Sequence, residues 1–202
     1  FKTLDNLIAS FTKFASMSKV IIFNGDDENT IKSVQRITGK EKITFGSDAT
    51  SNYYYKNLEW VHGAFAKFTV FKDGEELGEI ELNVPGEHNI LNALCAVATG
   101  MYCGATFEQC KQSLYNFKGA GRRFEKIAEK NGITIVDDYA HHPAEIKVTL
   151  SAAVKMGYKR VVAVFQPFTF SRTAMLLNDF AEALSIADKV VLTEIMGSRE
   201  KN

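Results

Sequence analysis

The chain has 202 residues, enough for one large domain or two small ones that each bury a core. Apolar residues make up 46% and charged residues 24%, which excludes a disordered or collagen-like chain. Lysine plus arginine and aspartate plus glutamate both number 24, so the net charge of zero provides no general attraction to nucleic acid or to an anionic membrane. We therefore expect a soluble globular protein without a nucleic-acid partner.

The cysteines and the apolar runs indicate the compartment. Cys95, Cys103 and Cys110 are odd in number and lie in or beside apolar helical segments, which disfavours a disulfide framework and favours a reducing cytoplasm. Their spacings match no zinc pattern, so small buried side chains are the favoured interpretation. No apolar run reaches the roughly 18 residues that span a bilayer, and no membrane insertion is expected. Both ends lack an opening or closing element, as in a piece of a longer protein.

The first half of the chain shows a mixture of helical and strand patterns. Apolar residues recur at helical spacing over residues 4–14, and a short apolar run at 20–23 leads into the acidic turn 24–27. From about residue 42 to 83, short runs rich in Tyr, Phe, Val and Ile alternate with glycine turns. This pattern predicts an antiparallel meander. Asp26 and Asp27 are interpreted as a solvated turn rather than a metal site.

Two helices are expected after Pro85-Gly86, over about 90–101 and 106–116. His88, Asn89 and Asn92 stand at the start of the first helix. Asparagine often caps a helix, so a simple helix start explains these residues. Two amides on one helical face could alternatively recognise the edge of a planar base such as adenine.

The last third predicts a β-α-β-α-β order. Apolar runs at 133–136, 160–165 and 189–193 are separated by two helical segments, and they do not alternate with polar residues. We predict an α/β fold in which these three strands are parallel and end along one edge of a sheet. Gly119-Ala120-Gly121 is a natural hinge, and the domain boundary is therefore placed near residue 122, giving domains 1–122 and 123–202.

Polar loops follow the first two of these strands, at 137–143 and at 166–173. They contain Asp138 and His141, which can hold a ribose hydroxyl or exchange protons, and Arg172, which can bind a carboxylate or phosphate. The alternative is structural: Asp138 and His142 cap the following helix, and Arg172 is a solvated helix residue. Taken together, the residue types suit a charged small molecule.

Several common catalytic patterns are absent from the sequence. There is no G-x-x-x-x-G-K-[ST] loop and no G-x-G-x-x-G, H-E-x-x-H or C-x-x-C motif. A nucleoside triphosphate would need its main phosphate cradle outside these residues. Arg122-Arg123 at the hinge could be a surface pair, or could reach a phosphate on which two domains close.

Five collinear segments resemble the Mur ligase family of peptidoglycan synthesis, most closely its members that use L-alanine. The resemblance extends along the whole chain. The segments are Asn24 to Asn29, Leu82 to Ala93, Gly121 to Glu125, Asp137 to Ile146, and Phe165 to Thr173.

The resemblance implies a place within a three-domain protein. Residues 1–122 would form the latter part of a central ATP-binding domain, and residues 123–202 the first part of a Rossmann-like carboxyl-terminal domain. The implied activity is ATP-dependent ligation of L-alanine to the carboxylate of UDP-N-acetylmuramate through an acyl phosphate, a step of cell-wall synthesis that affects cell shape and division. ATP and Mg²⁺ would be required, with the phosphate loop and metal ligands outside this chain.

The resemblance also implies roles for individual residues, and none of them is a nucleophile. Adenine contacts are implied for Asn89 and Asn92 with His88 beside them, phosphate and ribose contacts for Arg123 and Asp138, and the amino-acid pocket for Tyr139, His141 and Arg172, with Arg172 on the alanine carboxylate. Catalysis would come from positioning and charge stabilisation, with domain closure as a condition.

Two positions depart from the family pattern. Phe168 stands where histidine is frequent, and Thr169 where some members carry a second arginine, so carboxylate binding would depend mainly on Arg172. Two alternatives are kept: a related ligase that attaches a recycled peptide to UDP-N-acetylmuramate, and a non-catalytic nucleotide-binding module. This fragment alone is predicted to be inactive.

Overall fold

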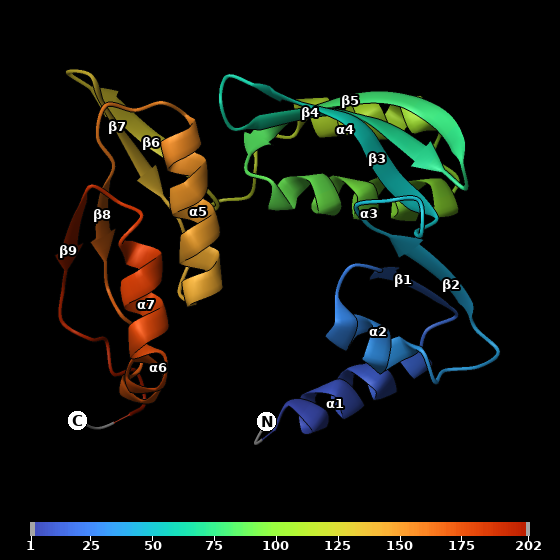
Figure 1. Cartoon of the computed structure of the whole chain (residues 1–202), viewed down its shortest axis with the longest axis horizontal. Coiled ribbons are helices and arrows are strands. Elements are labelled where there is room, and N and C mark those ends of the chain that lie inside the picture. The colour runs from blue at the N-terminus through green and yellow to red at the C-terminus, as the bar shows by residue number, and fades with distance from the viewer. Residues whose placement is uncertain (1–2, 201–202) are drawn as a thin grey trace. The chain divides into compact units, whose positions relative to one another are not determined.

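The computed structural model describes residues 3–200 and has a mixed α/β fold (Figure 1). Its contacts divide the chain into two compact units. The first contains residues 1–59, 66–82 and 88–117, and the second contains residues 60–65, 83–87 and 118–202. Within residues 3–200, no helix has the length and apolar character needed to cross a membrane.

The first unit is built on a five-stranded sheet in the order β1-β2-β3-β4-β5. The strands are β1 (Val20–Asn24), β2 (Glu41–Phe45), β3 (Tyr53–Val61), β4 (Phe65–Lys72) and β5 (Glu75–Pro85). β1 pairs with β2 in parallel over five residue pairs. β3, β4 and β5 follow one another through turns of two or three residues, which only antiparallel neighbours allow. The meander is therefore confirmed for β3 to β5, whereas β2 joins β3 through a parallel bridge at Phe45 and Tyr53.

Turn and capping residues explain where several of these elements begin and end. Asp73 and Gly74, between β4 and β5, both have positive φ, as a tight hairpin turn requires. The side chain of Asp27 accepts the N–H of Thr30 and starts α2 (Glu28–Val34), while Asp26 accepts the N–H of Ser47. The acidic turn is thus a helix cap and a loop contact. α1 (Leu4–Ser16) begins after Thr3, whose hydroxyl accepts the N–H of Asn6.

Two further helices, α3 (His88–Tyr102) and α4 (Phe107–Asn116), complete the first unit. α4 starts with a reciprocal capping box between Thr106 and Gln109, and α3 contacts α4, β1 and β2. The largest fully buried side chains come from β4, β5 and α3. They are Phe68, Val70, Ile80, Leu82, Ile90, Leu94 and Val97.

Within residues 118–200, the second unit contains four strands and three helices. They are β6 (Glu125–Lys130), β7 (Ile133–Asp137), α5 (Pro143–Lys155), β8 (Val162–Phe165), α6 (Phe170–Met175), α7 (Leu177–Leu184) and β9 (Lys189–Leu192). β8 and β9 pair in parallel, as the apolar runs predicted. β7 instead pairs antiparallel with β6, a strand that the sequence analysis did not predict.

The prediction that three strands form one parallel sheet is wrong. Among residues 3–200, β6-β7 and β8-β9 form separate two-stranded sheets, and no ladder joins β7 to β8. The physical reason is that an apolar run predicts that a strand forms but does not indicate which other strand it pairs with. Asn131 and Gly132 both have positive φ and form the tight turn that folds β6 onto β7.

The core of the second unit lies between α5 and α7. Ile146 and Leu150 of α5 pack with Phe180, Ala183 and Leu184 of α7. These residues were predicted to share helical faces. Val154 was expected on the same face of α5, but it is 48% exposed in the last turn of that helix.

Candidate functional site

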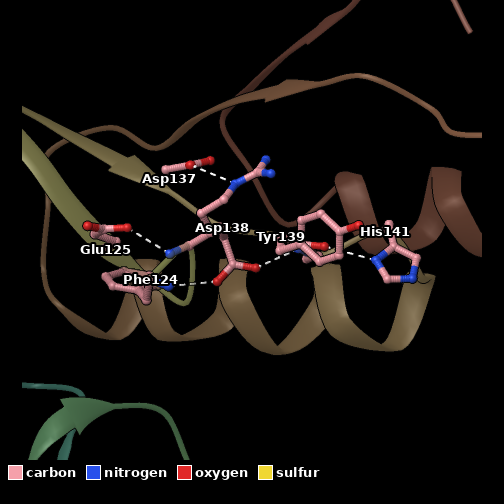
Figure 2. Close-up of polar contacts among 8 residues, drawn as sticks. Phe124, Glu125, Asp137, Asp138, Tyr139 and His141 are labelled. Atoms are coloured by element: carbon pink, nitrogen blue, oxygen red, sulfur yellow. Dashed lines mark hydrogen bonds and ion pairs between the residues drawn. The ribbon is translucent and has the colours of Figure 1, made fainter. Parts of the chain in front are cut away.

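The loop that follows β7 carries the predicted tyrosine and histidine side by side. The rings of Tyr139 and His141 meet edge to face with centroids 5.2 Å apart (Figure 2). Tyr139 is 52% exposed, so this pair is open to solvent. Two side chains predicted to line one pocket are therefore brought together.

Asp138 organises this loop through backbone contacts. One of its carboxylate oxygens accepts the N–H of Phe124 at 2.8 Å, and the other accepts the N–H of Ala140 at 2.8 Å (Figure 2). Asp138 therefore ties the start of β6 to the end of β7. It does not cap α5, so that part of the structural alternative is wrong.

Arg122 is held over Tyr139. Its guanidinium carbon lies 4.8 Å from the centre of the Tyr139 ring, and its Nε lies 3.0 Å from an oxygen of Asp137. The carbonyl of Arg122 accepts the N–H of Tyr139 at 2.8 Å. The ion pair is largely exposed and contributes no more than about 1 kcal/mol, but the three contacts together restrict the tyrosine.

The segment that carries Arg122 has an unusual backbone. Arg122 and Phe124 have φ values of 57° and 49°, a region that costs non-glycine residues of order 1 kcal/mol each. Hydrogen bonds oppose this cost, because Glu125 accepts the N–H of Arg122 at 2.7 Å and Asp138 accepts that of Phe124. Strain held by its surroundings is frequent at binding sites.

Glu145, in the first turn of α5, contacts both histidines. One of its oxygens accepts the N–H of His141 at 2.9 Å and that of His142 at 3.2 Å. The Nδ1 of His142 accepts the N–H of Ala144 in return, which forms a capping box ahead of Pro143. The structural prediction for His142 is thus confirmed.

The charge state of Glu145 follows from these contacts. Partial burial opposes ionisation, but the backbone hydrogen bond and charge of His141, the N–H of His142 and the charge of Arg123 together lower the pKa of Glu145 below its ordinary value. Arg123 itself is exposed. Its guanidinium is thus near enough to act on the same carboxylate.

Arg172 lies in α6, after the end of β8. Its Nη1 is buried and has no hydrogen-bond partner among the described residues. Hydrogen bonds from the hydroxyl and N–H of Ser171, and more weakly the charge of Arg172, lower the pKa of Glu200. A buried donor without a partner is costly, so this guanidinium is suited to an anionic ligand.

The loop that precedes Arg172 has a strained start. Thr169 has a φ of 68°, which is rare for a β-branched residue. Its N–H donates to the carbonyl of Met196 at 2.9 Å, and its carbonyl accepts the hydroxyl of Thr173 at 2.7 Å. The first bond connects the loop after β8 with the segment after β9, and the second joins the end of that loop to α6.

The amides predicted to contact adenine lie in the first turn of α3. The Nδ2 of Asn92 donates to the Oδ1 of Asn89 at 3.0 Å, so the two side chains adjoin on one helical face. His88 is the first residue of the same helix and is exposed.

The predicted site residues fall into three local groups. Tyr139, His141 and Asp138 share one loop with Arg123 close to it, Asn89 and Asn92 adjoin on α3 beside His88, and Arg172 lies on α6. Among residues 3–200, no described contact joins Arg172 to Tyr139 or His141. Their roles toward a ligand stay predictions.

Two residues of the site were not singled out from the sequence. Glu145 belongs to the segment Asp137 to Ile146 that resembles the family, and a glutamate three residues after a helix-capping residue is a recognisable capping signal. Arg122 was noted only as half of a charged pair. No local pattern indicates that it would lie over Tyr139, since 17 residues separate them.

Family models match both parts of the chain. Residues 1–100 match the Mur ligase middle domain, and residues 122–202 match the glutamate ligase domain of Mur ligases. The chain therefore belongs to the Mur ligase family, which confirms the predicted resemblance.

The relatives within this family are more specific. The chain is 41% identical over 205 residues to a UDP-N-acetylmuramate--L-alanine ligase of Caldanaerobacter subterraneus, and 43% identical over 204 residues to one of Lachnospira eligens. These alignments cover 100% and 99% of this chain but 44% of each relative, so the chain spans less than half the length of the proteins it matches.

Solved structures show the same fold. The UDP-N-acetylmuramate-alanine ligase of Thermotoga maritima superposes with a TM-score of 0.79 at 30% identity, over 98% of this chain and 43% of that one. A murein peptide ligase of Psychrobacter arcticus gives a TM-score of 0.68 at 24% identity, over 95% of this chain and 41% of that one. The second likeness supports the fold alone.

Proposed function

We propose that the intact protein is an ATP-dependent ligase that joins L-alanine to the carboxylate of UDP-N-acetylmuramate. The observation that carries the proposal is the loop after β7: it places Tyr139 beside His141, in a chain 41% identical along its whole length to a relative with that name. The activity would serve peptidoglycan synthesis, and through it cell shape and division. Free cysteines and the absence of a membrane-spanning helix among residues 3–200 support a cytoplasmic enzyme.

The reaction needs an activated carboxylate, because a carboxylate anion resists attack by an amine. The muramoyl carboxylate takes the γ-phosphoryl group of ATP and becomes an acyl phosphate, with release of ADP. The amine of L-alanine then attacks the acyl carbon, and inorganic phosphate leaves as the amide bond forms. In this scheme the residues of this chain position the reactants and supply charge, and none is a covalent nucleophile.

The amino-acid pocket is assigned to the loops after β7 and β8. Tyr139 and His141 line it, and Arg172 holds the alanine carboxylate through a charge-assisted pair. The Nη1 of Arg172 is buried and has no hydrogen-bond partner within residues 3–200. This supports the role, because a carboxylate would supply the missing acceptor. The proposal requires that the two loops converge on one substrate.

The nucleotide site is assigned to both proposed domains, 1–122 and 123–202. Asn89 and Asn92, with His88 beside them, recognise adenine, while Arg123 and Asp138 approach the phosphates and ribose. Asp138 can do so only with oxygen lone pairs left free by Phe124 and Ala140, which suits one further hydrogen bond from a ribose hydroxyl.

Magnesium would be bound outside this chain. Within residues 3–200, no group of three or more His, Cys, Asp or Glu side chains is arranged to hold a metal ion. The phosphate loop and the UDP-binding domain are likewise assigned to other parts of the protein. When bound, Mg²⁺ would neutralise the charge of the ATP phosphates.

The proposal is tested by assaying the full-length protein with UDP-N-acetylmuramate and ATP. Phosphate release and product mass are measured with L-alanine, glycine, L-serine and a muramyl tripeptide as acceptors. We expect phosphate release with L-alanine and a product heavier by one alanyl residue. Turnover with the peptide but not with L-alanine would favour the peptide-adding ligase. Absence of turnover with every one of these acceptors would favour a non-catalytic nucleotide-binding module.

A further inference from the structure

The carboxylate of Glu145 lies against the imidazole of His141 from the first turn of a helix. The Nδ1 of His141 is 2.9 Å from the carbonyl oxygen of Tyr139 and 3.5 Å from Oε2 of Glu145. A carbonyl oxygen can only accept a hydrogen bond, and an ionised carboxylate also only accepts. The Tyr139 carbonyl therefore requires Nδ1 to carry a proton, and the nearby carboxylate of Glu145 favours the same state.

This arrangement selects one tautomer of the neutral ring. With the proton on Nδ1, the lone pair is on Nε2, and Nε2 can then only accept a hydrogen bond. Ionisation of Glu145 strengthens the selection, and hydrogen bonds from His141 and His142 lower the pKa of that carboxyl group. A protonated glutamic acid would not hold the tautomer in this way.

Glu145 also holds the backbone from which the ring projects. Its Oε2 accepts the N–H groups of His141 and His142, at 2.9 Å and 3.2 Å. Its own backbone is fixed in α5, beside Ile146, a core residue that is only 5% exposed. The ring of Tyr139 limits the imidazole on another side. The side chain is thus anchored on a rigid element while it orients a residue on a loop.

We propose that Glu145 is a positioning residue that keeps the proton on Nδ1 of His141, so that Nε2 accepts a hydrogen bond from the amine of the amino-acid substrate. The inference rests on the proposed function, because it needs an amino acid in this pocket. An amino acid has a donor end, its amine, and an acceptor end, its carboxylate. The Nε2 of neutral His141 can only accept a hydrogen bond, so it can bind the amine. The guanidinium of Arg172 can only donate, so it can bind the carboxylate. The two residues together then determine which way the substrate lies.

Glu145→Gln is the sharpest variant for a test. Glutamine also serves at this position of a capping box, so the start of α5 is retained while the charge is removed. Glu182→Gln is the matched control, because Glu182 lies on α7 and pairs with Lys147 at the surface, at 3.5 Å. The Glu182 side chain is 76% exposed and no role in the site is assigned to it.

The first measurement is independent of catalysis. The full-length protein is labelled with ¹⁵N-histidine, and the ring signals of His141 are assigned by their loss in His141→Gln. In the wild type, at a pH high enough for the ring to be neutral, we expect a protonated Nδ1 and an unprotonated Nε2. Glu145→Gln should move both signals part of the way toward a mixture of tautomers, because the Tyr139 carbonyl still faces Nδ1, whereas Glu182→Gln should leave them unchanged. A wild-type proton on Nε2, or an unchanged spectrum in Glu145→Gln, would overturn the inference.

The second measurement separates substrate affinities. Loss of one ordinary hydrogen bond changes an equilibrium about five-fold, so Glu145→Gln should raise KM for L-alanine by about that factor and leave KM for ATP unchanged. Equal changes in both KM values would contradict a role at the amine. If the wild type uses no amino acid, the proposed function and the amine contact both fail, while the ring signals still decide whether Glu145 selects the tautomer.

Discussion

At the scale of single residues, Asp138 holds a loop together through backbone contacts. Its two oxygens accept the N–H groups of Phe124 and Ala140, which lie on either side of the β6-β7 hairpin. These bonds close the segment in which Arg122 and Phe124 have positive φ. Substitution of Asp138 should therefore change the structure of the loop itself, whether or not a ligand is bound.

We expect Asp138→Ala to loosen this loop. Hydrogen bonds to a charged acceptor contribute about 1.5 to 3 kcal/mol each, so loss of two should speed amide exchange at Phe124 and Ala140 by at least about ten-fold. Hydrogen exchange of the full-length protein measures this directly. Asp138→Asn keeps one acceptor oxygen and should have an intermediate effect. Unchanged protection in Asp138→Ala would show that the two bonds do not hold the loop.

The proposed role of Arg172 is also that of a single residue, because it consists of one contact with the substrate carboxylate. Loss of a charge-assisted pair costs about 2 kcal/mol, so Arg172→Ala should raise KM for L-alanine roughly thirty-fold in the full-length enzyme. KM for ATP should change little. Steady-state kinetics with each substrate varied in turn measures both constants, and equal increases would argue against a carboxylate contact.

At the scale of elements, the β6-β7 hairpin decides where the site loop begins. Asn131 and Gly132 lie in the left-handed region at φ values of 53° and 74°, and this turn pairs Lys130 with Ile133. The Asn-Gly dipeptide is a strong hairpin signal, and it predicts a strand that precedes β7 and pairs with it. The antiparallel pairing of β7 follows from this local chemistry.

Gly132→Ala should weaken the hairpin. A Cβ added at Gly132 meets no atom within 4 Å, so the expected cost of about 1 kcal/mol is due to its positive φ alone. Gly121→Ala is a matched control, because the backbone there is not in the left-handed region and the nearest atom is Glu125 Oε2 at 3.7 Å. Exchange rates of the β6-β7 amides should rise in Gly132→Ala only. A similar rise in both variants would refute the backbone explanation.

The start of α5 should confer a pH dependence on stability. Glu145 has a lowered pKa in the folded protein, so its ionised form stabilises the fold above the ordinary value of 4.5. That contribution is lost as the pH falls from 4.5 through the lower folded pKa. The difference in melting temperature between wild type and Glu145→Gln should therefore be greatest above this range and shrink below it. A constant difference down to about pH 3 would contradict the assignment.

At the scale of the whole molecule, the chain holds only part of the machinery that the proposed reaction needs. It has no G-x-x-x-x-G-K-[ST] loop, and it spans 44% of the length of its alanine-ligase relatives. Two Mur ligase domain models nevertheless match it in order. The chain therefore belongs to the family, but family membership alone does not imply that these residues are sufficient for catalysis.

We expect residues 1–202 alone to show no alanine-dependent phosphate release, because the main phosphate cradle is missing. The full-length protein, assayed with the same substrates, should release phosphate only when L-alanine is present. Malachite-green detection of phosphate measures both proteins under the same conditions. Turnover by the 202-residue piece would contradict the assignment of the phosphate loop to another part of the protein.

Sequence patterns were most informative where the structure depends on neighbours along the chain. The Pro143 start of α5 and the Thr106 start of α4 could be predicted, because capping involves residues two or three positions apart. The parallel pairing of β8 with β9 also followed from their apolar runs. Collinear motifs were enough to recognise the family, since each retains its local residue pattern.

Tertiary structure alone decided the partners that lie far apart in the chain. Arg122 pairs with Asp137 across 15 positions, and β7 hydrogen-bonds to β6 rather than to β8. Glu145 adds a subtler case, because its capping role is local while its contact with the His141 ring depends on how the loop folds back. Local patterns determine which element forms, but a contact between distant residues is determined by the path of the whole chain, which no short pattern specifies.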